Sequence, residues 1–234
     1  MDKLYIIIPA YNEQDNIETI AREWHDVVTK VGVESRLVII DDGGKDNTYD
    51  ILRGLQAECL QLIPIRKDNT GHGATVQYGY EYALKQGADY IFQTDSDGQT
   101  VSNEFYKFWE MRENYDVIIG NRNNRKDGIS RVVVTKILKM ILFLIFGLWI
   151  TDANTPFRLM KSEVLEKYMP KIPENYNLTN VLLSVIFKKY KENVLFVPIT
   201  FRERQGGVNS INVRKIIVIG KNAVVDFINL KKSI

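Results

Sequence analysis

The sequence predicts an α/β protein whose mostly parallel β-sheet is covered by helices on both faces. Apolar runs of strand length alternate with helical patterns along residues 4–120, and this alternation is typical of parallel sheets. The first run is continuously apolar, as expected of a strand buried on both faces. A chain of 234 residues is long enough for one large domain with a sizeable core.

The first half of the chain accounts for five strands and their helices. After the run at residues 4–8, Ile17, Trp24 and Val31 belong to an apolar stripe with three- and four-residue steps, which predicts a helix. Pro64 places the third strand at an edge or an end. The expected strands are 4–8, 37–40, 60–65, the run leading into Asp95, and 116–120; the expected helices are 17–31, one capped by Asp46 or Asn47, 74–86 and 103–113.

Residues 123–234 are expected to complete the same domain, with residues 1–122 as its nucleotide-binding half. The run at residues 140–150 is uncharged and helix-like, but a bilayer core takes about twenty residues to span. Cations precede the run, so it suits a helix lying in a membrane interface, with Trp149 at the headgroups. A buried core helix or an oligomer contact is the alternative. A strand at 194–201 and an amphipathic helix near 212–230 follow.

Polar residues follow each of the five expected strands at the point where the strand ends. Carboxyl ends of parallel strands meet at one edge of a sheet, and ligands of open α/β folds bind there. One such cluster alone would indicate only a turn, whereas five clusters at the same edge of the sheet predict a ligand-binding site. The clusters are Pro9–Glu13, Asp41-Asp42, Asn69–Gly73, Asp95–Gln99 and Asn121-Arg122.

The fourth cluster predicts a metal site. Alternate residues of an extended chain share a face, so Asp95 and Asp97 point the same way, and Gln99 is in phase if the chain stays extended. Paired carboxylates repel each other, and oxygen ligands suit Mg²⁺ or Mn²⁺, which keep positions for water and substrate phosphates. An acidic turn is the alternative, because Asp-Gly is a common turn dipeptide.

These clusters resemble the ordered signature of family-2 inverting glycosyltransferases with the GT-A fold. The likeness covers almost the whole chain and is strongest to the dolichyl-phosphate mannose synthase branch, which attaches sugars to polyprenyl phosphates. Gly44 departs from the pattern, because the family usually has Ser there. The matching segments are residues 9–13, 40–48, 69–73, 95–99, 120–122, 152–159 and 204–210.

On the donor side, the resemblance implies a nucleotide-sugar site. Pro9, Ala10, Tyr11 and Glu13 would line the nucleoside pocket. Asp42 would accept a hydrogen bond from the base, supported by Asp41, although Asp is also favoured where a helix begins. Gly71 and His72 would lie on the phosphate side, although His72 could be a loop residue without a role. Asp95, Asp97 and Gln99 would bind the metal. Arg122 would bind a phosphate, with a plain surface arginine as the alternative.

On the acceptor side, the resemblance implies that Arg158 grips an acceptor phosphate and that Asp152 is the candidate general base. Many relatives that act on hydroxyl groups have a Glu-Asp pair where this chain has residues 177–180, Asn-Leu-Thr-Asn. A phosphate oxygen is already an anionic nucleophile and needs no base, so a polyprenyl-phosphate acceptor is expected. Arg202, Arg204 and Ser210 would belong to a basic lid over the substrates.

Charge and composition favour a peripheral membrane protein of the cytoplasm. The net charge of +2 divides into +7 for residues 188–234 and −5 for the rest, which suits a membrane surface or phosphate better than nucleic acid. The single cysteine excludes an internal disulfide, and no signal peptide is expected. A sugar or protein hydroxyl acceptor, with Asp152 as base, and a catalytically silent nucleotide-sugar-binding protein remain alternatives.

Overall fold

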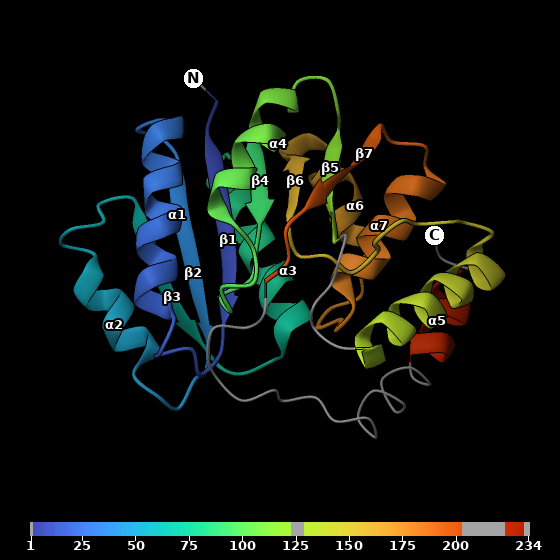
Figure 1. Ribbon diagram of the computed structural model, residues 1–234, viewed down its shortest axis with the longest axis horizontal. Helices are drawn as coiled ribbons and strands as arrows, with labels where there is room; N and C mark the ends of the chain where they lie inside the picture. Colours follow the sequence, from blue (N-terminus) through green and yellow to red (C-terminus); the bar gives the residue numbers. More distant parts are fainter. Residues whose placement is uncertain (1, 123–128, 203–222, 232–234) are drawn as a thin grey trace.

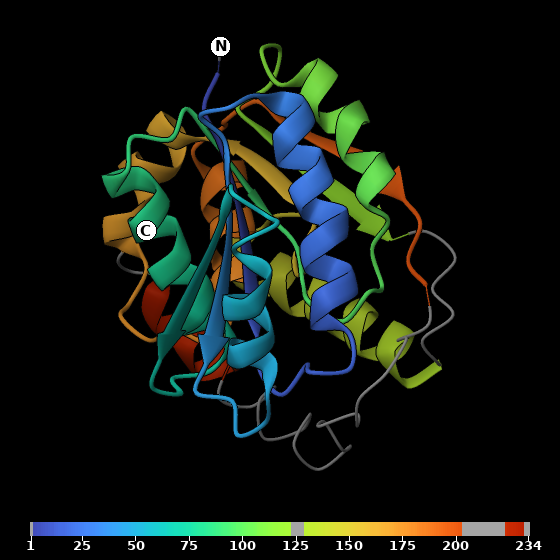
Figure 2. The same cartoon turned by 90° about the vertical axis from the view of Figure 1, so that its left-hand side faces the viewer.

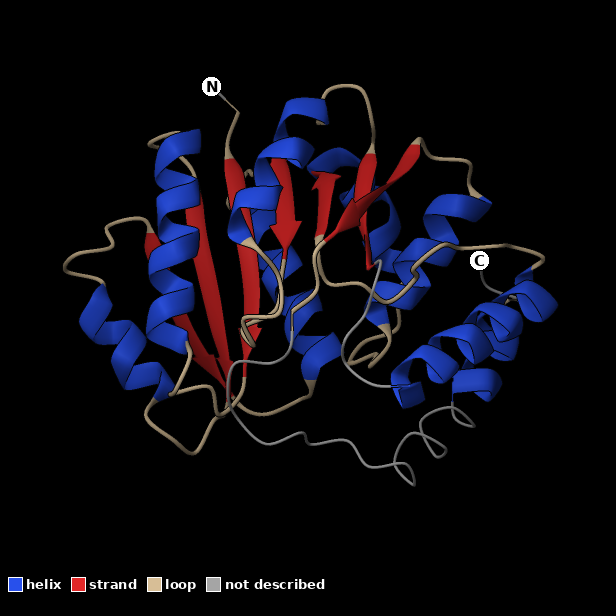
Figure 3. Ribbon diagram, viewed as in Figure 1, coloured by secondary structure: helices blue, strands red, loops and turns tan. Residues whose placement is uncertain are grey.

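The computed structural model of the chain contains one seven-stranded sheet in the order β3-β2-β1-β4-β6-β5-β7 (Figures 1 and 3). It describes residues 2–122, 129–202 and 223–231, without the side chains of residues 129–134. Every strand is parallel to its neighbour except β6, which is antiparallel to β4 and β5. The strands are β1 Leu4–Ala10, β2 Arg36–Asp42, β3 Leu62–Lys67, β4 Tyr90–Gln93, β5 Val117–Arg122, β6 Arg158–Lys161 and β7 Val194–Ile199.

The predicted fold class and mostly parallel sheet are confirmed, and β3 is an edge strand as Pro64 indicates. The sequence analysis missed β6. This strand has only four residues, and two of them are charged, so it shows no apolar run. Its place between β4 and β5 comes from backbone pairing, in which Arg158 lies opposite Gln93 of β4.

Helices cover both faces of the sheet and form two separate cores (Figure 2). Ile6 and Ile8 of β1 pack with Trp24 on the face of α1, α2 and α4. Ile7 points the other way and packs with Tyr80 on the face of α3, α6 and α7. The helices are α1 Ile17–Val31, α2 Thr48–Leu55, α3 His72–Lys85, α4 Phe105–Met111, α5 Ile129–Phe146, α6 Ser162–Tyr168 and α7 Thr179–Lys189, with 3₁₀ turns at Ser102–Glu104 and Met169–Lys171.

Helix α5 lies away from the sheet, beside a helical stretch at residues 223–230 (Figure 1). Phe146 contacts Phe227 of that stretch, with 6.0 Å between ring centroids. Leu142 is buried, whereas Leu144 is 72% exposed, so the apolar helix is buried on one side only. Among the described residues, no helix is both long and apolar enough to span a bilayer. Residues 212–222 of the expected last helix lie outside the described residues.

Candidate active site

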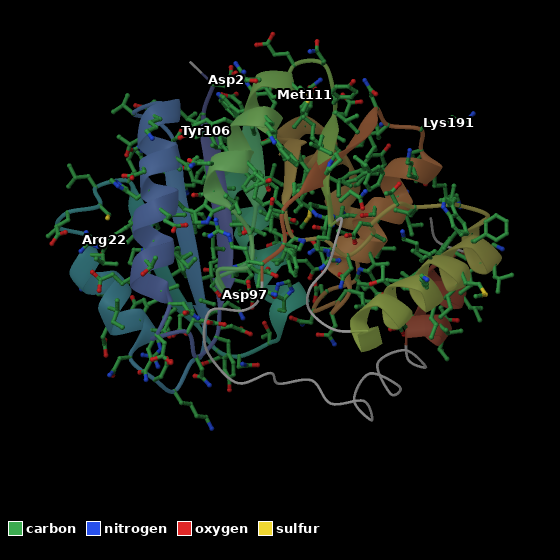
Figure 4. The ribbon with its side chains drawn as sticks, in the orientation of Figure 1. Asp2, Arg22, Asp97, Tyr106, Met111 and Lys191 are labelled. Atoms are coloured by element: carbon green, nitrogen blue, oxygen red, sulfur yellow. The ribbon has the colours of Figure 1, made fainter. Side chains whose placement is uncertain are left out.

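The polar clusters of the sequence meet at the carboxyl edge of the sheet. Strands β1 to β5 all end at this edge, because β5 runs parallel to β4 on the far side of the antiparallel β6. Figure 4 shows Asp97 at this edge, whereas Asp2, which precedes β1, lies at the opposite end of the sheet. The edge is therefore the candidate site, and the predicted residues in the described part of the chain can be located relative to it.

The end of β1 provides an ordered turn at the edge. Pro9 and Ala10 are buried within the strand, whereas Tyr11 is 45% exposed. Asn12 has a positive φ of 54°, a conformation that Asn tolerates better than most residues, and its Oδ1 accepts a hydrogen bond from Lys45 N at 2.8 Å. Glu13 is buried, and its Oε2 accepts from Asn16 Nδ2 at 3.1 Å. Tyr11 is thus the residue of this cluster with a ring available to a ligand.

Asp41 supports the turn after β2. Its Oδ1 accepts from Gly44 N at 3.0 Å, and its Oδ2 lies 3.4 Å from Arg66 Nε. Burial raises the pKa of Asp41, and the Gly44 hydrogen bond and Arg66 only partly offset this effect. A Cβ atom on Gly44 would lie 2.6 Å from Asp41 Oδ1. The absence of a side chain at Gly44 therefore allows the Asp41 carboxylate to lie this close to the turn.

Asp42 organises the loop after β3. Its carboxylate accepts from Lys67 Nζ, from Thr70 N at 3.0 Å and from Gly71 N at 2.9 Å. Burial alone would raise the pKa of Asp42, but the bonds from Lys67, Thr70 and Thr75 outweigh it and hold the pKa below its usual value. Asp42 is therefore a stably ionised carboxylate that anchors residues 67–71 beside the place predicted for the nucleotide base.

The two glycines that begin α3 have different tasks. Gly71 has a φ of 91°, which favours glycine, and it presents its N–H to Asp42. At Gly73 a Cβ atom would lie 2.1 Å from Tyr176 O and 2.5 Å from Asn177 O. The close approach at Gly73 is thus to the segment before α7.

His72 and the two aspartates form the centre of the site. His72 Nε2 lies 2.9 Å from Asp95 Oδ1. Burial lowers the pKa of His72, but the negative charges of Asp95 and Asp97 outweigh it and raise the pKa overall. Both aspartates are partly exposed, whereas Ser96 between them is buried. Both carboxylates are therefore accessible at this edge of the sheet. Strand β4 ends at Gln93 and Gly98 has a φ of 71°, so the chain does not stay extended as far as Gln99.

The carboxylates at this centre fit a divalent cation that shares its ligands with a substrate. Among the described residues, no group of three or more His, Cys, Asp or Glu side chains could hold a metal ion by itself. Asp95 and Asp97 can supply two oxygen ligands, and Mg²⁺ or Mn²⁺ commonly takes its other ligands from phosphates and water. The donor set is thus suited to an ion that binds together with a diphosphate.

Gln99, the third predicted metal ligand, is buried and joined to Arg202. Its Nε2 donates to Arg202 O at 2.9 Å, and Arg202 N donates to Gln99 O at 2.8 Å. Arg202 is exposed beside the Asp95–Gln99 turn. The structure therefore brings the start of the predicted basic lid to the aspartate cluster, whereas Arg204 and Ser210 lie outside the described residues.

Arg122 and Asp152 bind each other. Arg122 donates from Nε to Asp152 Oδ2 and from Nη2 to Asp152 Oδ1, both at 2.8 Å. Their side chains are only 8% and 5% exposed, and the Arg122 guanidinium lies 5.2 Å from the Phe201 ring centroid. The Arg122 fork is thus engaged by a carboxylate, and both oxygens of Asp152 are bonded to Arg122. The roles expected for Arg122 at a phosphate and for Asp152 as a general base stay predictions.

Arg158, which the resemblance assigns to an acceptor phosphate, is held by backbone carbonyl oxygens. The residue is fully buried at the start of β6. Its guanidinium donates to the carbonyl oxygens of Ala153, Thr155 and Asn180. With no exposed surface, the side chain cannot reach a phosphate in this conformation.

Lys67 is a site residue that the sequence analysis missed. Its Nζ contacts Asp42, Thr70 Oγ1 at 2.6 Å and Thr75 Oγ1 at 3.3 Å. The residue lies opposite Asp42 in the register of β2 and β3. A lysine at the end of a strand is unremarkable in a sequence, and only the pairing of the strands could have revealed it.

Comparisons with known proteins find similarity along most of the chain. The sequence profile named Glycosyl transferase family 2 matches residues 5–169. The UDP-N-acetylglucosamine–dolichyl-phosphate N-acetylglucosaminyltransferase of Methanococcus voltae is 29% identical over 219 residues, which cover 85% of each chain. The polyprenol monophosphomannose synthase of Mycolicibacterium smegmatis is 26% identical over 216 residues, covering 88% of this chain and 80% of the relative. An undecaprenyl-phosphate 4-deoxy-4-formamido-L-arabinose transferase of Klebsiella pneumoniae is 22% identical over 218 residues. The matched part covers 92% of this chain and 64% of that relative.

Solved structures share the fold. The glucosyl-3-phosphoglycerate synthase of Mycobacterium tuberculosis, in complex with Mn²⁺, uridine diphosphate and phosphoglyceric acid, superposes with a TM-score of 0.70 at 12% identity, over 98% of this chain and 78% of the other. This likeness confirms the predicted GT-A fold. The profile match covers well over half of the chain, so the protein belongs to glycosyl transferase family 2 and is a glycosyltransferase that resembles the polyprenyl-phosphate branch.

Proposed function

We propose that this glycosyltransferase transfers a sugar from a GDP- or UDP-sugar to a polyprenyl phosphate, with inversion at the anomeric carbon. The observation that carries the proposal is the Arg122–Asp152 ion pair. It engages both oxygens of the carboxylate that the sequence offers as a general base for a hydroxyl acceptor, which supports an acceptor that needs no base. A phosphate acceptor needs no such base, and the relatives from Methanococcus voltae and Mycolicibacterium smegmatis are named for dolichyl-phosphate and polyprenol acceptors.

The donor is assigned to the ends of β1, β2 and β4. The exposed Tyr11 ring offers a stacking surface for a base. Asp42 and Lys67 hold the loop that carries Thr70 and Gly71, so backbone geometry near the diphosphate is fixed before the donor arrives. Pre-organisation of this kind lowers the cost of aligning reactants.

Asp95 and Asp97 would hold a divalent ion, Mg²⁺ or Mn²⁺, against the donor diphosphate. Such an ion neutralises charge that builds up on a departing diphosphate. His72, hydrogen-bonded to Asp95, orients that carboxylate. In the reaction, an oxygen of the acceptor phosphate forms a bond to the anomeric carbon while the bond from that carbon to the donor diphosphate breaks. The products are a polyprenyl-phosphate sugar and a nucleoside diphosphate.

The acceptor implies work at a membrane surface, and α5 is the element suited to it. Its exposed apolar residues lie with Lys136 and Lys139 on a helix without acidic residues. This combination favours an interface with anionic lipid headgroups. The exposed residues of this apolar face are Ile137, Met140, Phe143 and Leu144. The exposed Trp149 follows the helix, and its ring centroid lies 6.0 Å from that of Phe143. The chain would thus act as a peripheral protein at the cytoplasmic face of a membrane.

A transfer assay tests the proposed reaction. Purified protein is incubated with radiolabelled GDP- and UDP-sugars, with Mn²⁺ or Mg²⁺, and with polyprenyl phosphate, soluble sugars or a protein acceptor in parallel. Label is expected in the organic phase only when polyprenyl phosphate is present. Transfer to a soluble hydroxyl acceptor, or nucleotide binding without turnover on any acceptor, would overturn the proposal in favour of one of the two alternatives.

A further inference from the structure

Thr179, the first residue of α7, connects the start of that helix to the start of α3. Its Oγ1 donates to Tyr176 O at 2.8 Å and lies 3.2 Å from Gly73 O, a second acceptor for the same proton. Thr179 is fully buried, and a buried hydroxyl that loses its partners is costly. The side chain therefore joins two stretches of backbone that lie 106 residues apart in the sequence.

Two further contacts hold α3 against the segment before α7, residues 173–178. Gln77 Nε2 of α3 donates to Pro173 O at 3.0 Å. At Gly73 a Cβ atom would lie 2.1 Å from Tyr176 O, so backbone meets backbone there without room for a side chain. Together with Thr179, these contacts give the first turns of α3 a fixed position against this segment.

His72 lies between two backbone groups that are held by different parts of the fold. The preceding residue, Gly71, donates its N–H to Asp42 Oδ2 at 2.9 Å. The following residue, Gly73, is held through its carbonyl oxygen by Thr179. The end of β2 and the start of α7 therefore fix the backbone on both sides of this histidine.

The position of the His72 ring depends on that backbone. The side chain is 51% exposed, so the packing around the ring does not fix its direction. Its Nε2 lies 2.9 Å from Asp95 Oδ1, and hydrogen bonds weaken steeply as their geometry departs from the optimum. A displacement of Gly73 would move the adjacent His72 and disturb its bond to Asp95.

We propose that Thr179 is a positioning residue for the donor-side metal centre and holds His72 at Asp95 through the carbonyl group of Gly73. Thr179 is buried and acts through these residues, so it is not itself a ligand. The inference rests on the proposed function, in which Asp95 and Asp97 hold the ion against the donor diphosphate. It predicts that loss of the Thr179 hydroxyl weakens the binding of a nucleoside diphosphate together with the metal.

Calorimetry with Mn²⁺ and either GDP or UDP tests the proposal. Thr179→Val keeps the shape of the side chain and removes its hydroxyl, so the dissociation constant of the nucleotide is expected to rise about five- to tenfold. Thr179→Ser keeps the hydroxyl and should stay within about twofold of the wild type. Ser184→Ala is the matched control, because this buried hydroxyl of the same helix donates to Ala153 O and Asn180 O, and it should also stay within about twofold.

Thermal unfolding separates positioning from stability. Thr179→Val and Ser184→Ala each remove a buried hydroxyl that bonds to backbone carbonyls, so both should lower the melting temperature by similar amounts. An equal rise of the dissociation constant in the two variants, or no rise in Thr179→Val, would overturn the proposal. If Thr179→Val does not fold, Gln77→Leu, which removes the bond to Pro173 O, decides by the same criteria.

The His72 ring gives a readout that needs neither metal nor substrate. The chain has two histidines, so the imidazole ¹⁵N signals of His72 are compared with those of His25 in α1, at one fixed pH. The His72 signals are expected to shift in Thr179→Val and to stay in place in Ser184→Ala, with His25 constant in both. Unchanged His72 signals in Thr179→Val contradict the positioning role.

The two readouts also distinguish this inference from the proposed function. Should the wild type bind neither GDP nor UDP in the presence of Mn²⁺, the proposed function falls. The ring signals then still decide whether Thr179 holds His72 at Asp95.

Discussion

Arg122 and Asp152 join the two ends of the segment that carries α5. One residue ends β5 and the other precedes β6, and both hydrogen bonds between the guanidinium and the carboxylate measure 2.8 Å. One buried ion pair therefore connects the point where the chain leaves the sheet, after β5, with the point where it returns, before β6. The pair connects the predicted membrane-facing helix to the edge that carries the candidate site.

Breaking this pair should destabilise the protein. Arg122→Ala or Asp152→Ala leaves the partner buried and uncompensated, a change that costs roughly 3–5 kcal/mol. The double variant should lose clearly less than the sum of the two single losses, because it removes both charges. Urea denaturation of the four proteins measures the coupling. Lys85→Ala at the exposed Lys85–Glu81 pair is the control and should change little; additive losses at Arg122 and Asp152 would show that the pair is not coupled.

Removal of a metal-site carboxylate should abolish transfer without unfolding the protein. Asp97→Asn keeps the size of the side chain and removes its charge, so the rate is expected to fall by about a thousandfold, equivalent to several kcal/mol of lost electrostatic stabilisation. Asp50→Asn, on the exposed face of α2, is the matched control and should be fully active. Metal-dependent stabilisation by the donor nucleotide in a thermal-shift experiment should vanish only in Asp97→Asn. Full activity of that variant, with the metal still required, contradicts the assignment.

The two glycine positions in α2 and α3 should respond oppositely to alanine. Gly73→Ala places a Cβ atom 2.1 Å from Tyr176 O, so the backbone must move, at a cost of about 1–3 kcal/mol. Gly54→Ala, within α2, meets no atom within 4 Å and should stabilise the helix by about 0.5–1 kcal/mol. Thermal unfolding compares the two variants with the wild type. Equal stability of Gly73→Ala and wild type would show that α3 is not closely packed on the segment before α7.

Asp42 should contribute to acid sensitivity. Its folded-state pKa lies below the reference value of 3.8 because of the bonds from Lys67, Thr70 and Thr75, which outweigh burial. Its contribution to the free energy of unfolding is therefore complete above the unfolded pKa and is lost as the pH falls through the folded pKa. Asp42→Asn should lower stability at pH 7 and flatten its decline below about pH 4. An unchanged acid limb in the variant would show that Asp42 is not a source of the pH dependence.

The apolar face of α5 should bind lipid. Leu144→Ser removes a side chain that is 72% exposed, and loss of a buried leucine corresponds to about 1.5–3 kcal/mol, or roughly tenfold or more in vesicle affinity. Leu60→Ser, at a position 84% exposed outside this helix, is the control and should bind as the wild type does. Flotation with phosphatidylglycerol and with phosphatidylcholine vesicles measures the effect. Equal binding of both variants to anionic vesicles would exclude α5 as the contact.

The sequence by itself determined the fold class and the edge of the sheet where the polar clusters, with the partly exposed Asp95 and Asp97, come together. These features follow from local patterns: apolar runs give strands, and the polar residues that follow them must lie where parallel strands end. Family membership also followed from motifs in chain order. The fold class and the shared edge need only local patterns and the rule that parallel strands end at one edge, whereas the family needed the resemblance of these motifs to a known signature.

The tertiary structure alone decided what the long cationic side chains do. Arg122, Arg158 and Lys67 all lie at or next to the ends of strands that carry the polar clusters. In the structure, Arg122 binds Asp152, Arg158 binds three backbone carbonyl oxygens and Lys67 binds Asp42. A flexible charged side chain reaches several ångströms, and its partner is whatever oxygen the fold brings within that radius. The four-residue β6 has the same origin, because it exists only where β4 and β5 provide edges for it to pair with.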